Sequence, residues 1–204
     1  MTQNFLDKAY DLPEGGDARK LYSEWADTYE AELTQNGYAT PGRIAKALAR
    51  LAPDKSLPLL DYGCGTGLSG AAFAEAGFTT IDGIDVTKEM LDVAREKRVY
   101  RNIILADPSA PPPVEAGSYP MIAAVGVIGI GAAPLSLFDV LMGLLPAGGL
   151  FAFSFNDHAL EHPEFEAKVN EWIDCAAARL LMREHGPHIP GKNINANVYI
   201  LEKA

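Results

Sequence analysis

The segment that most constrains the fold of this chain is the glycine-rich run at residues 59–67, which reads LLDYGCGTG. A short apolar run ends at Asp61, three glycines then alternate with other residues, and a helical pattern follows from Leu68 to Ala76. Glycines lack a Cβ atom and tolerate positive φ, so the main chain of such a turn can come close to a ligand. The free N–H groups of the next helix point toward the same place. The run therefore predicts a strand, a tight turn and a helix.

Two common ligands of glycine-rich turns do not fit the spacing. A dinucleotide site requires G-x-G-x-x-G, whereas Leu68 stands at the third glycine position and Gly67 comes one residue early. A phosphate loop requires a lysine after its last glycine, and none follows here. A carboxylate at Asp61 would repel a pyrophosphate and would suit a ligand with an ammonium group. A glycine-rich turn without any ligand is the alternative at this point.

A second apolar segment, residues 79–85, ends in Asp85, which lies 22 residues after Gly63. In doubly wound folds, an acid at the end of the second strand accepts hydrogen bonds from the hydroxyl groups of a ribose. Thr87 predicts the N-cap of a helix over residues 88–97. The alternative for Asp85 is therefore an acid that merely interacts with the dipole of this helix.

A third apolar segment, residues 102–107, ends in Asp107. Because the carboxyl ends of parallel strands meet at one edge of a sheet, we expect Asp61, Asp85 and Asp107 to lie along that edge. Open α/β sheets bind their ligands there.

From about Leu21 to Leu201 the chain resembles a class I S-adenosylmethionine-dependent methyltransferase, and more narrowly the Williams–Beuren-region methyltransferase-like proteins and their bacterial relatives. Four sequence segments carry this resemblance: YSEWADTYE at 22–30, LLDYGCGTGL at 59–68, IDGIDVTKEMLDVAREK at 81–97, and AVGVIGIGAAP at 124–134 followed by LPAGGLFAFS at 145–154. The loop 128–131 departs from the family, because it reads Ile-Gly-Ile-Gly where a Thr-His pair is frequent.

The resemblance implies an α/β fold, a three-layer doubly wound (Rossmann-like) sheet of seven strands in the order 3-2-1-4-5-7-6 with the last strand antiparallel. It implies S-adenosylmethionine as the cofactor and methyl transfer as the activity. The expected cofactor-binding residues are Asp61, Gly63, Cys64, Gly65, Asp85, Val86, Met90, Ala106, Asp107, Val125, Tyr22 and Tyr29.

The catalytic residues are not readable from the sequence. Tyr29 could contact the sulfonium of the cofactor through its ring face, and His158 follows the fifth strand, where a general base could lie. Both have ordinary structural alternatives, in core packing and in helix capping. Two other functions stay open: a non-catalytic S-adenosylmethionine-binding regulator or scaffold, suggested by the apolar loop 127–133, and an NAD-dependent oxidoreductase.

Composition bounds the remaining possibilities. The net charge is −10 over 204 residues, and no basic run is present. Affinity for nucleic acids depends on clustered Lys and Arg, so we expect a small-molecule acceptor rather than a nucleic acid. The two cysteines and four histidines show no metal-binding spacing, so no metal is expected. The uncharged stretch 116–138 contains two prolines and several glycines, which favours a buried strand and loop over a membrane span. We expect a cytoplasmic protein of unknown oligomeric state.

One domain is expected over residues 1–204, with a loose segment at 1–16 and a helical cap at 17–52. Within the cap, Asp17 could begin a helix with Leu21, Trp25, Tyr29 and Leu33 on one face, and Thr40-Pro41 should cap a second helix. Further strands are expected at 57–61, 121–125, 150–155 and 198–202, and further helices at 135–145 and 164–175. Residues 179–185 are ambiguous between strand, as the resemblance implies, and helix, and Gly186-Pro187 predicts a turn between His185 and His188.

Overall fold

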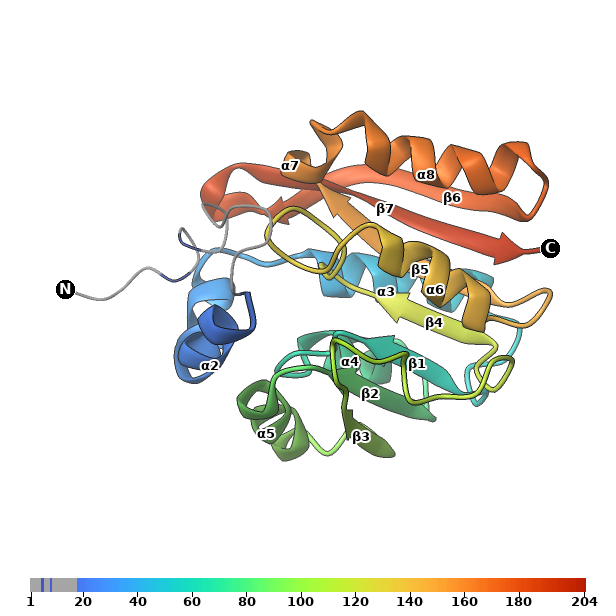
Figure 1. The fold of residues 1–204 in the computed structure, drawn as a ribbon. Helices are drawn as coiled ribbons and strands as arrows, with labels where there is room; N and C mark the ends of the chain where they lie inside the picture. Colours follow the sequence, from blue (N-terminus) through green and yellow to red (C-terminus); the bar gives the residue numbers. More distant parts are fainter. Residues whose placement is uncertain (1–4, 6–7, 9–17) are drawn as a thin grey trace.

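The computed structural model describes residues 5, 8 and 18–204, and the predicted loose segment 1–16 and the cap at Asp17 otherwise lie outside the described residues. Seven strands form one sheet with helices on both faces (Figure 1). The strands are β1 (Leu59–Tyr62), β2 (Ile81–Asp85), β3 (Asn102–Leu105), β4 (Met121–Ala124), β5 (Leu150–Asn156), β6 (Ala178–Ile189) and β7 (Ile194–Lys203). The helices are α2 (Ala18–Gln35), α3 (Thr40–Leu51), α4 (Leu68–Glu75), α5 (Lys88–Glu96), α6 (Ser136–Leu144), α7 (Asp157–Leu160), α8 (Pro163–Asp174) and the short 3-10 helix η1 (Pro190–Lys192).

The strand order is β3-β2-β1-β4-β5-β7-β6, as the resemblance implies. Strands β1 to β5 pair in parallel, whereas β7 is antiparallel to both β5 and β6. The predicted fold class is therefore confirmed. The reversal at β4 and β1 makes the carboxyl edge between them the switch point of the sheet, where α/β folds of this kind bind ligands.

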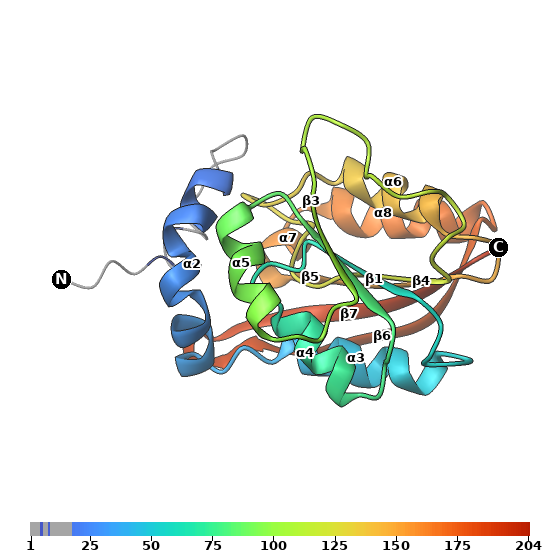
Figure 2. The ribbon, with the colours of Figure 1, turned by 90° about the horizontal axis from the view of Figure 1, so that it is seen from below.

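The central strands are buried on both faces, and alternate residues enter two different cores. Phe151 and Phe153 of β5 pack with Phe138 of α6 and with residues of α8, while Leu150 and Ala152 pack with residues of α3 and α4. Figure 2 shows these two helix pairs on opposite sides of the sheet. Because successive strand residues point to opposite faces, a parallel strand covered on both sides has apolar side chains throughout.

Helix α2 lies beyond the carboxyl ends of the parallel strands, next to α5 (Figures 1 and 2). Its predicted apolar face is observed: Trp25 and Leu33 are buried, and Tyr29 packs against Trp25 with ring centroids 4.6 Å apart. An ion pair between Glu30 and Lys97 also connects α2 to the end of α5. No helix in the described part of the chain is long and apolar enough to cross a membrane.

The start of α3 differs from the prediction. Ala39 rather than Thr40 occupies the N-cap, and Thr40 is already helical. The Thr40 hydroxyl instead lies 2.7 Å from Nδ1 of His188 on β6, and both residues are buried. The Thr40 side chain therefore makes a tertiary hydrogen bond to His188 instead of a local capping bond at the start of α3.

The predicted turn at Gly186-Pro187 is wrong, because these residues lie inside β6. The strand interpretation of residues 179–185 is confirmed. Pro187 is tolerated because β6 is an edge strand and its register shifts between Pro187 and Ile189. Where the register of β6 shifts, the backbone carbonyl groups need hydrogen-bond donors from outside the sheet.

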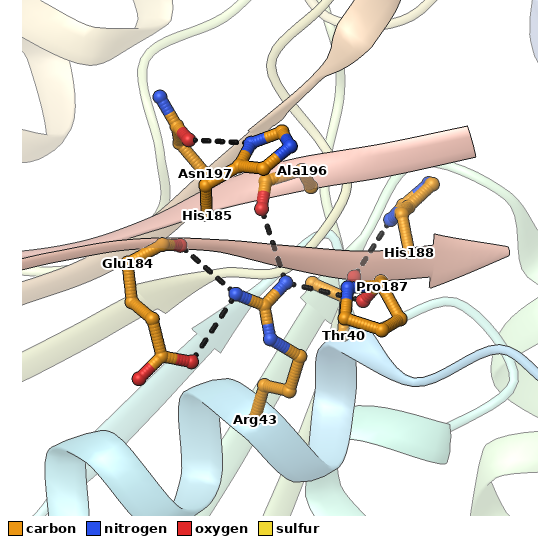
Figure 3. Close-up of polar contacts among 8 residues, drawn as sticks. All are labelled: Thr40, Arg43, Glu184, His185, Pro187, His188, Ala196 and Asn197. Carbon is orange, nitrogen blue, oxygen red and sulfur yellow. Dashed lines mark hydrogen bonds and ion pairs between the residues drawn. The ribbon is translucent and has the colours of Figure 1, made fainter. Parts of the chain in front are cut away.

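Arg43 of α3 supplies those partners (Figure 3). Its guanidinium donates to the carbonyl oxygens of Glu184, Pro187 and Ala196 at 2.9, 3.1 and 3.0 Å, and its side chain is only 14% exposed. The planar guanidinium carries five N–H donors in a fixed arrangement, which suits a cluster of carbonyl groups. Arg43 thus connects α3 to the last residues of β6 and the first residues of β7.

We expect Arg43→Ala to lower the free energy of unfolding by about 2 kcal/mol, because partly buried carbonyl groups lose their donors. Chemical denaturation measures this change. Arg50→Ala on the same helix is the matched control, since Arg50 is exposed, and it should change stability by less than about 0.5 kcal/mol. Equal effects of the two substitutions would contradict the role given to Arg43.

Candidate functional site

The glycine-rich turn after β1 has the conformation that its sequence predicts. Gly63 and Gly65 both have positive φ, +70° and +53°. A Cβ atom on Gly63 would collide with the side chain of Val127, so the turn packs tightly against the loop after β4. A Cβ atom on Gly65 would meet no atom within 4 Å, so open space lies beside that residue.

This open space belongs to a cavity of about 760 Å³ at the carboxyl edge of the sheet. Its wall includes the glycine turn, the ends of β1 and β2, the start of α5, the loops after β3 and β4, the start of α6, and two tyrosines of α2. Eight of the predicted cofactor-binding residues line it: Tyr22, Tyr29, Gly63, Gly65, Asp85, Val86, Met90 and Val125.

Asp85 connects the turn to the second strand. Its Oδ2 accepts a hydrogen bond from the N–H of Gly65 at 2.9 Å, and its Oδ1 accepts one from the N–H of Thr87 at 2.8 Å. Burial raises the pKa of the Asp85 carboxyl, while these N–H groups act in the opposite direction. Thr87 occupies the predicted N-cap position of α5, but its side chain makes no cap hydrogen bond. Each carboxylate oxygen can accept a further bond, so ribose hydroxyl groups could still be received.

Asp61 is not part of the cavity wall. Its side chain is fully buried, and its Oδ2 accepts hydrogen bonds from the hydroxyls of Ser69 and Tyr100 at 2.6 and 2.7 Å. Its Oδ1 has no donor among the described residues. Burial raises the pKa of this carboxyl to about 6, against the lowering effect of both hydroxyls. The orphaned oxygen is compatible with a nearby ammonium group, and that role stays a prediction.

Three other predicted residues also do not line the cavity. Cys64 is buried against Gly83 on β2, and burial raises the pKa of its thiol, so it fills space. Ala106 is buried. Asp107 is exposed, and its Oδ1 accepts hydrogen bonds from the N–H and hydroxyl of Ser109. The residues after it, 108–112, form the cavity wall instead.

A second, smaller cavity of about 70 Å³ adjoins the first. The two walls share Tyr22, Tyr29, Gly126 and Ala132, so helix α2 and the loop after β4 lie between them. Burial, followed by the charge of Asp85, raises the pKa of Tyr22 to about 12, so this phenol keeps its proton at neutral pH. Of the two candidate catalytic residues, Tyr29 lies in both walls and His158 lies in neither.

The smaller cavity is lined by Tyr38 from the turn after α2, Ser154 and Asn156 from β5, and His188 from β6. Asn156 is, with Asp157 and His158, one of the candidate general bases that the sequence offers after the fifth apolar run, although it lies at the end of β5 and not in a loop. Sequence patterns did not indicate Tyr38, Ser154 or His188. In the described part of the chain, no three His, Cys, Asp or Glu side chains come together as a metal site would require.

Residues 59–149 match the family described as a methyltransferase domain. Human Methyltransferase-like protein 27 is 27% identical over 143 residues, which are 69% of this chain and 58% of the human protein. Residues 59–149 thus resemble the methyltransferase domain of class I S-adenosylmethionine-dependent methyltransferases. This confirms the resemblance, including its narrower form, and S-adenosylmethionine as the cofactor. The chain spans only about three-fifths of that relative's length (58%).

The chain is also similar to two further proteins. A probable 18S rRNA (guanine-N(7))-methyltransferase of Dictyostelium discoideum is 38% identical over 86 residues, 42% of this chain and 30% of that protein. The solved structure of magnesium protoporphyrin IX methyltransferase from Synechocystis, with bound S-adenosylmethionine, has a TM-score of 0.62 at 16% identity. It covers 80% of this chain and 78% of that chain and shows that the fold is shared.

The expectation that the net charge disfavours a nucleic-acid substrate is wrong. Curated relatives of this chain from several organisms are 18S rRNA (guanine-N(7))-methyltransferases. Net charge is a property of the whole chain, whereas an acceptor is received by a local surface. The value of −10 therefore does not decide the substrate class.

The larger cavity fits the cofactor. Its volume lies within the range of about 300–1,000 Å³ that ligand sites occupy. The space beside Gly65 admits a ligand close to the main chain, and Asp85 lies where a ribose would be bound. The glycine turn would receive the amino-acid end, with Tyr22 and Tyr29 covering the site from α2.

We expect Asp85→Ala to weaken binding of S-adenosylmethionine at least tenfold, which corresponds to about 1.4 kcal/mol. The substitution removes both the ribose acceptor and the bond that fixes Gly65. Calorimetric titration measures the affinity, with Asp92→Ala on the exposed side of α5 as the control. Unchanged affinity would remove the ribose role of Asp85.

A second expectation concerns Asp61 in the free protein. The pKa of its carboxyl is raised on folding, so its contribution to stability is complete below about pH 3.8 and is lost as the pH rises through about 6. The loss should be about 3 kcal/mol over that interval. Chemical denaturation of the wild type and of Asp61→Asn at several pH values measures the difference, because the amide does not titrate. Parallel pH profiles would contradict the assignment, and the exposed Asp92→Asn is the control.

Proposed function

We propose that this chain catalyses methyl transfer from S-adenosylmethionine to an acceptor held in the smaller cavity. The observation that carries this proposal is that the walls of the two cavities share four residues, Tyr22, Tyr29, Gly126 and Ala132. When bound, the cofactor supplies an electrophilic methyl group: a lone pair of the acceptor forms the new bond, and the electron pair of the broken C–S bond stays on sulfur in S-adenosylhomocysteine. A site beside the cofactor is what this reaction requires.

The protein holds the cofactor and the acceptor in position and excludes water from the site. Correct alignment of two bound reactants can supply roughly 7–11 kcal/mol of the barrier. Tyr29 lies at the junction, where its ring face could stabilise the positive charge of a sulfonium. Its catalytic role is part of the proposal. His158 lies on α7 away from both cavities, and we assign it no role.

Two acceptor classes are compatible with this activity. A small molecule is favoured by the limited size of the smaller cavity, about 70 Å³. A guanine of ribosomal RNA is favoured by the names of the rRNA (guanine-N(7))-methyltransferases among the relatives. A base that is turned out of its RNA strand presents only one ring system to the enzyme, so the cavity can serve either class.

The test uses S-adenosylmethionine labelled in its methyl group. The protein is incubated separately with a small-molecule extract and with ribosomal subunits, and Asp85→Ala serves as the cofactor-site control. We expect saturable label transfer in one of the two incubations, inhibited by S-adenosylhomocysteine and reduced at least tenfold by Asp85→Ala. Tight cofactor binding without transfer to either would favour the non-catalytic alternative, in which the chain is a regulator or scaffold. Binding of NADH in place of S-adenosylmethionine, detected by its fluorescence, would overturn the proposal.

A further inference from the structure

The order of the strands sets the direction in which the cofactor lies in the larger cavity. Strand β2, which ends at Asp85, lies between β1 and β3. With the ribose at Asp85 and the amino-acid end at the glycine turn after β1, the adenine of the cofactor extends toward the carboxyl end of β3. The loop after β3 lines the cavity there with residues 108–112. This loop is therefore the part of the wall that meets the adenine.

The hydrogen-bond donors of this loop are already used within the loop. The N–H groups of Ser109 and Ala110 donate to Oδ1 and to the carbonyl oxygen of Asp107, at 2.8 and 3.1 Å. The Ser109 hydroxyl donates to the same Oδ1 at 2.6 Å. The other three residues of the segment 108–112 are prolines, which have no N–H group. The segment thus has no main-chain N–H left for a ligand.

The side chain of Asp107 belongs to the loop and not to the cavity wall. Its two hydrogen bonds from Ser109 form a local turn of the kind that aspartate favours, and the residue does not line the cavity. Of the described residues in that wall, Asp85 alone carries a charge. Val86 and Met90, which follow Asp85, add apolar side chains. The wall therefore offers no carboxylate for the exocyclic amino group of the adenine.

Helix α6 contributes further apolar side chains to the same wall. The loop after β3 lies alongside α6 (Figure 2), and the N–H of Gly117 donates to the carbonyl oxygen of Leu144 at 2.8 Å. Leu137 and Val140 of α6 line the cavity, and Val140 is 41% exposed. Ser136 is the polar residue of α6 in this wall. Because a lining residue is exposed, the cavity opens to solvent beside α6.

We propose that the site holds the adenine by shape and apolar contact and does not read its exocyclic amino group, so that an apolar substituent on that nitrogen is admitted beside α6. The ligand class is an adenosyl cofactor enlarged by an aromatic ring at this nitrogen. Such a ring would remove apolar surface of the prolines, Leu137 and Val140 from water, which favours binding. The inference rests on the proposed function for the cofactor, and on the ribose role of Asp85 for its direction.

The test measures three affinities by calorimetric titration. The ligands are S-adenosylhomocysteine, its analogue with a benzyl group on the exocyclic nitrogen, and its analogue with two methyl groups there, which has no N–H left on that nitrogen. We expect the benzyl analogue to bind tighter than S-adenosylhomocysteine by a factor of about three or more, and the dimethyl analogue to bind within a factor of about three. Asp85→Ala should weaken all three ligands alike.

Substitutions in α6 locate the benzyl group. Val140→Asp places a charge in the apolar wall, so it should abolish the advantage of the benzyl analogue and leave the affinity for S-adenosylhomocysteine unchanged. The charge-matched control is Gly143→Asp on the same helix, because Gly143 is exposed, lies outside the wall, and a Cβ there meets no atom within 4 Å. This control should keep the advantage.

Two further substitutions test whether a side chain reads the amino group. Asp107→Ala and Ser136→Ala should each change the affinities for S-adenosylhomocysteine and for its dimethyl analogue by the same factor. A loss confined to S-adenosylhomocysteine would show that the substituted side chain receives the amino group, and it would overturn the inference. A common loss reports only on the shape of the loop or helix.

Weaker binding of the benzyl analogue than of S-adenosylhomocysteine by the wild type also overturns the inference, as does an advantage that survives Val140→Asp. The proposed function fails in a different way, through missing transfer of the methyl label although S-adenosylhomocysteine binds. That failure leaves the ranking of the three ligands unaffected, since the titrations need no acceptor.

Discussion

The hydrogen bond from the Gly65 amide to the Asp85 carboxylate is the interaction on which the arrangement of the site depends. It joins the turn after β1 to the last residue of β2, and the second oxygen of the same carboxylate holds the first turn of α5 through Thr87. The turn after β1 and the residue that precedes α5 therefore share one partner, the Asp85 carboxylate. The open space beside Gly65 exists because a residue without a Cβ occupies the bend and because this bond keeps the bend in place.

The fold was largely predictable, because its strands are marked by apolar runs and its turns by glycine. The exact ends of the helices and strands were harder to predict, and the start of α3 shows the reason. The Thr40 side chain bonds to His188, almost 150 residues later in the chain, and a local pattern cannot report such a partner. The error at Gly186-Pro187 has a similar origin. Proline is incompatible with a central strand, but β6 lies at the edge of the sheet and Arg43 donates hydrogen bonds to two of its carbonyl oxygens.

Asp61, Asp85 and Asp107 follow the same sequence pattern, but the pattern does not determine which of them lines the larger cavity. Each closes an apolar run, yet only Asp85 lines the larger cavity. Asp61 lies inside β1 rather than at its end, so its side chain enters the core beneath the turn and meets Ser69 and Tyr100. Asp107 comes two residues after the end of β3 and bonds to its own loop. Because strand side chains alternate between faces, a shift of one or two residues changes what an acid can reach. Of the residues that line the smaller cavity, the sequence offered Asn156 as a candidate base, but Tyr38 and His188 reach the cavity from segments far apart in the chain and could not be predicted.

Helix α2 contributes Tyr22 and Tyr29 to the walls of both cavities. A ligand that fixes these two side chains in one cavity has already ordered part of the wall of the other. The second ligand then meets a smaller entropic cost, so the two binding free energies are coupled, and by thermodynamic reciprocity each ligand tightens the other by the same factor. If both cavities bind ligands, the shared helix would therefore couple the two binding free energies.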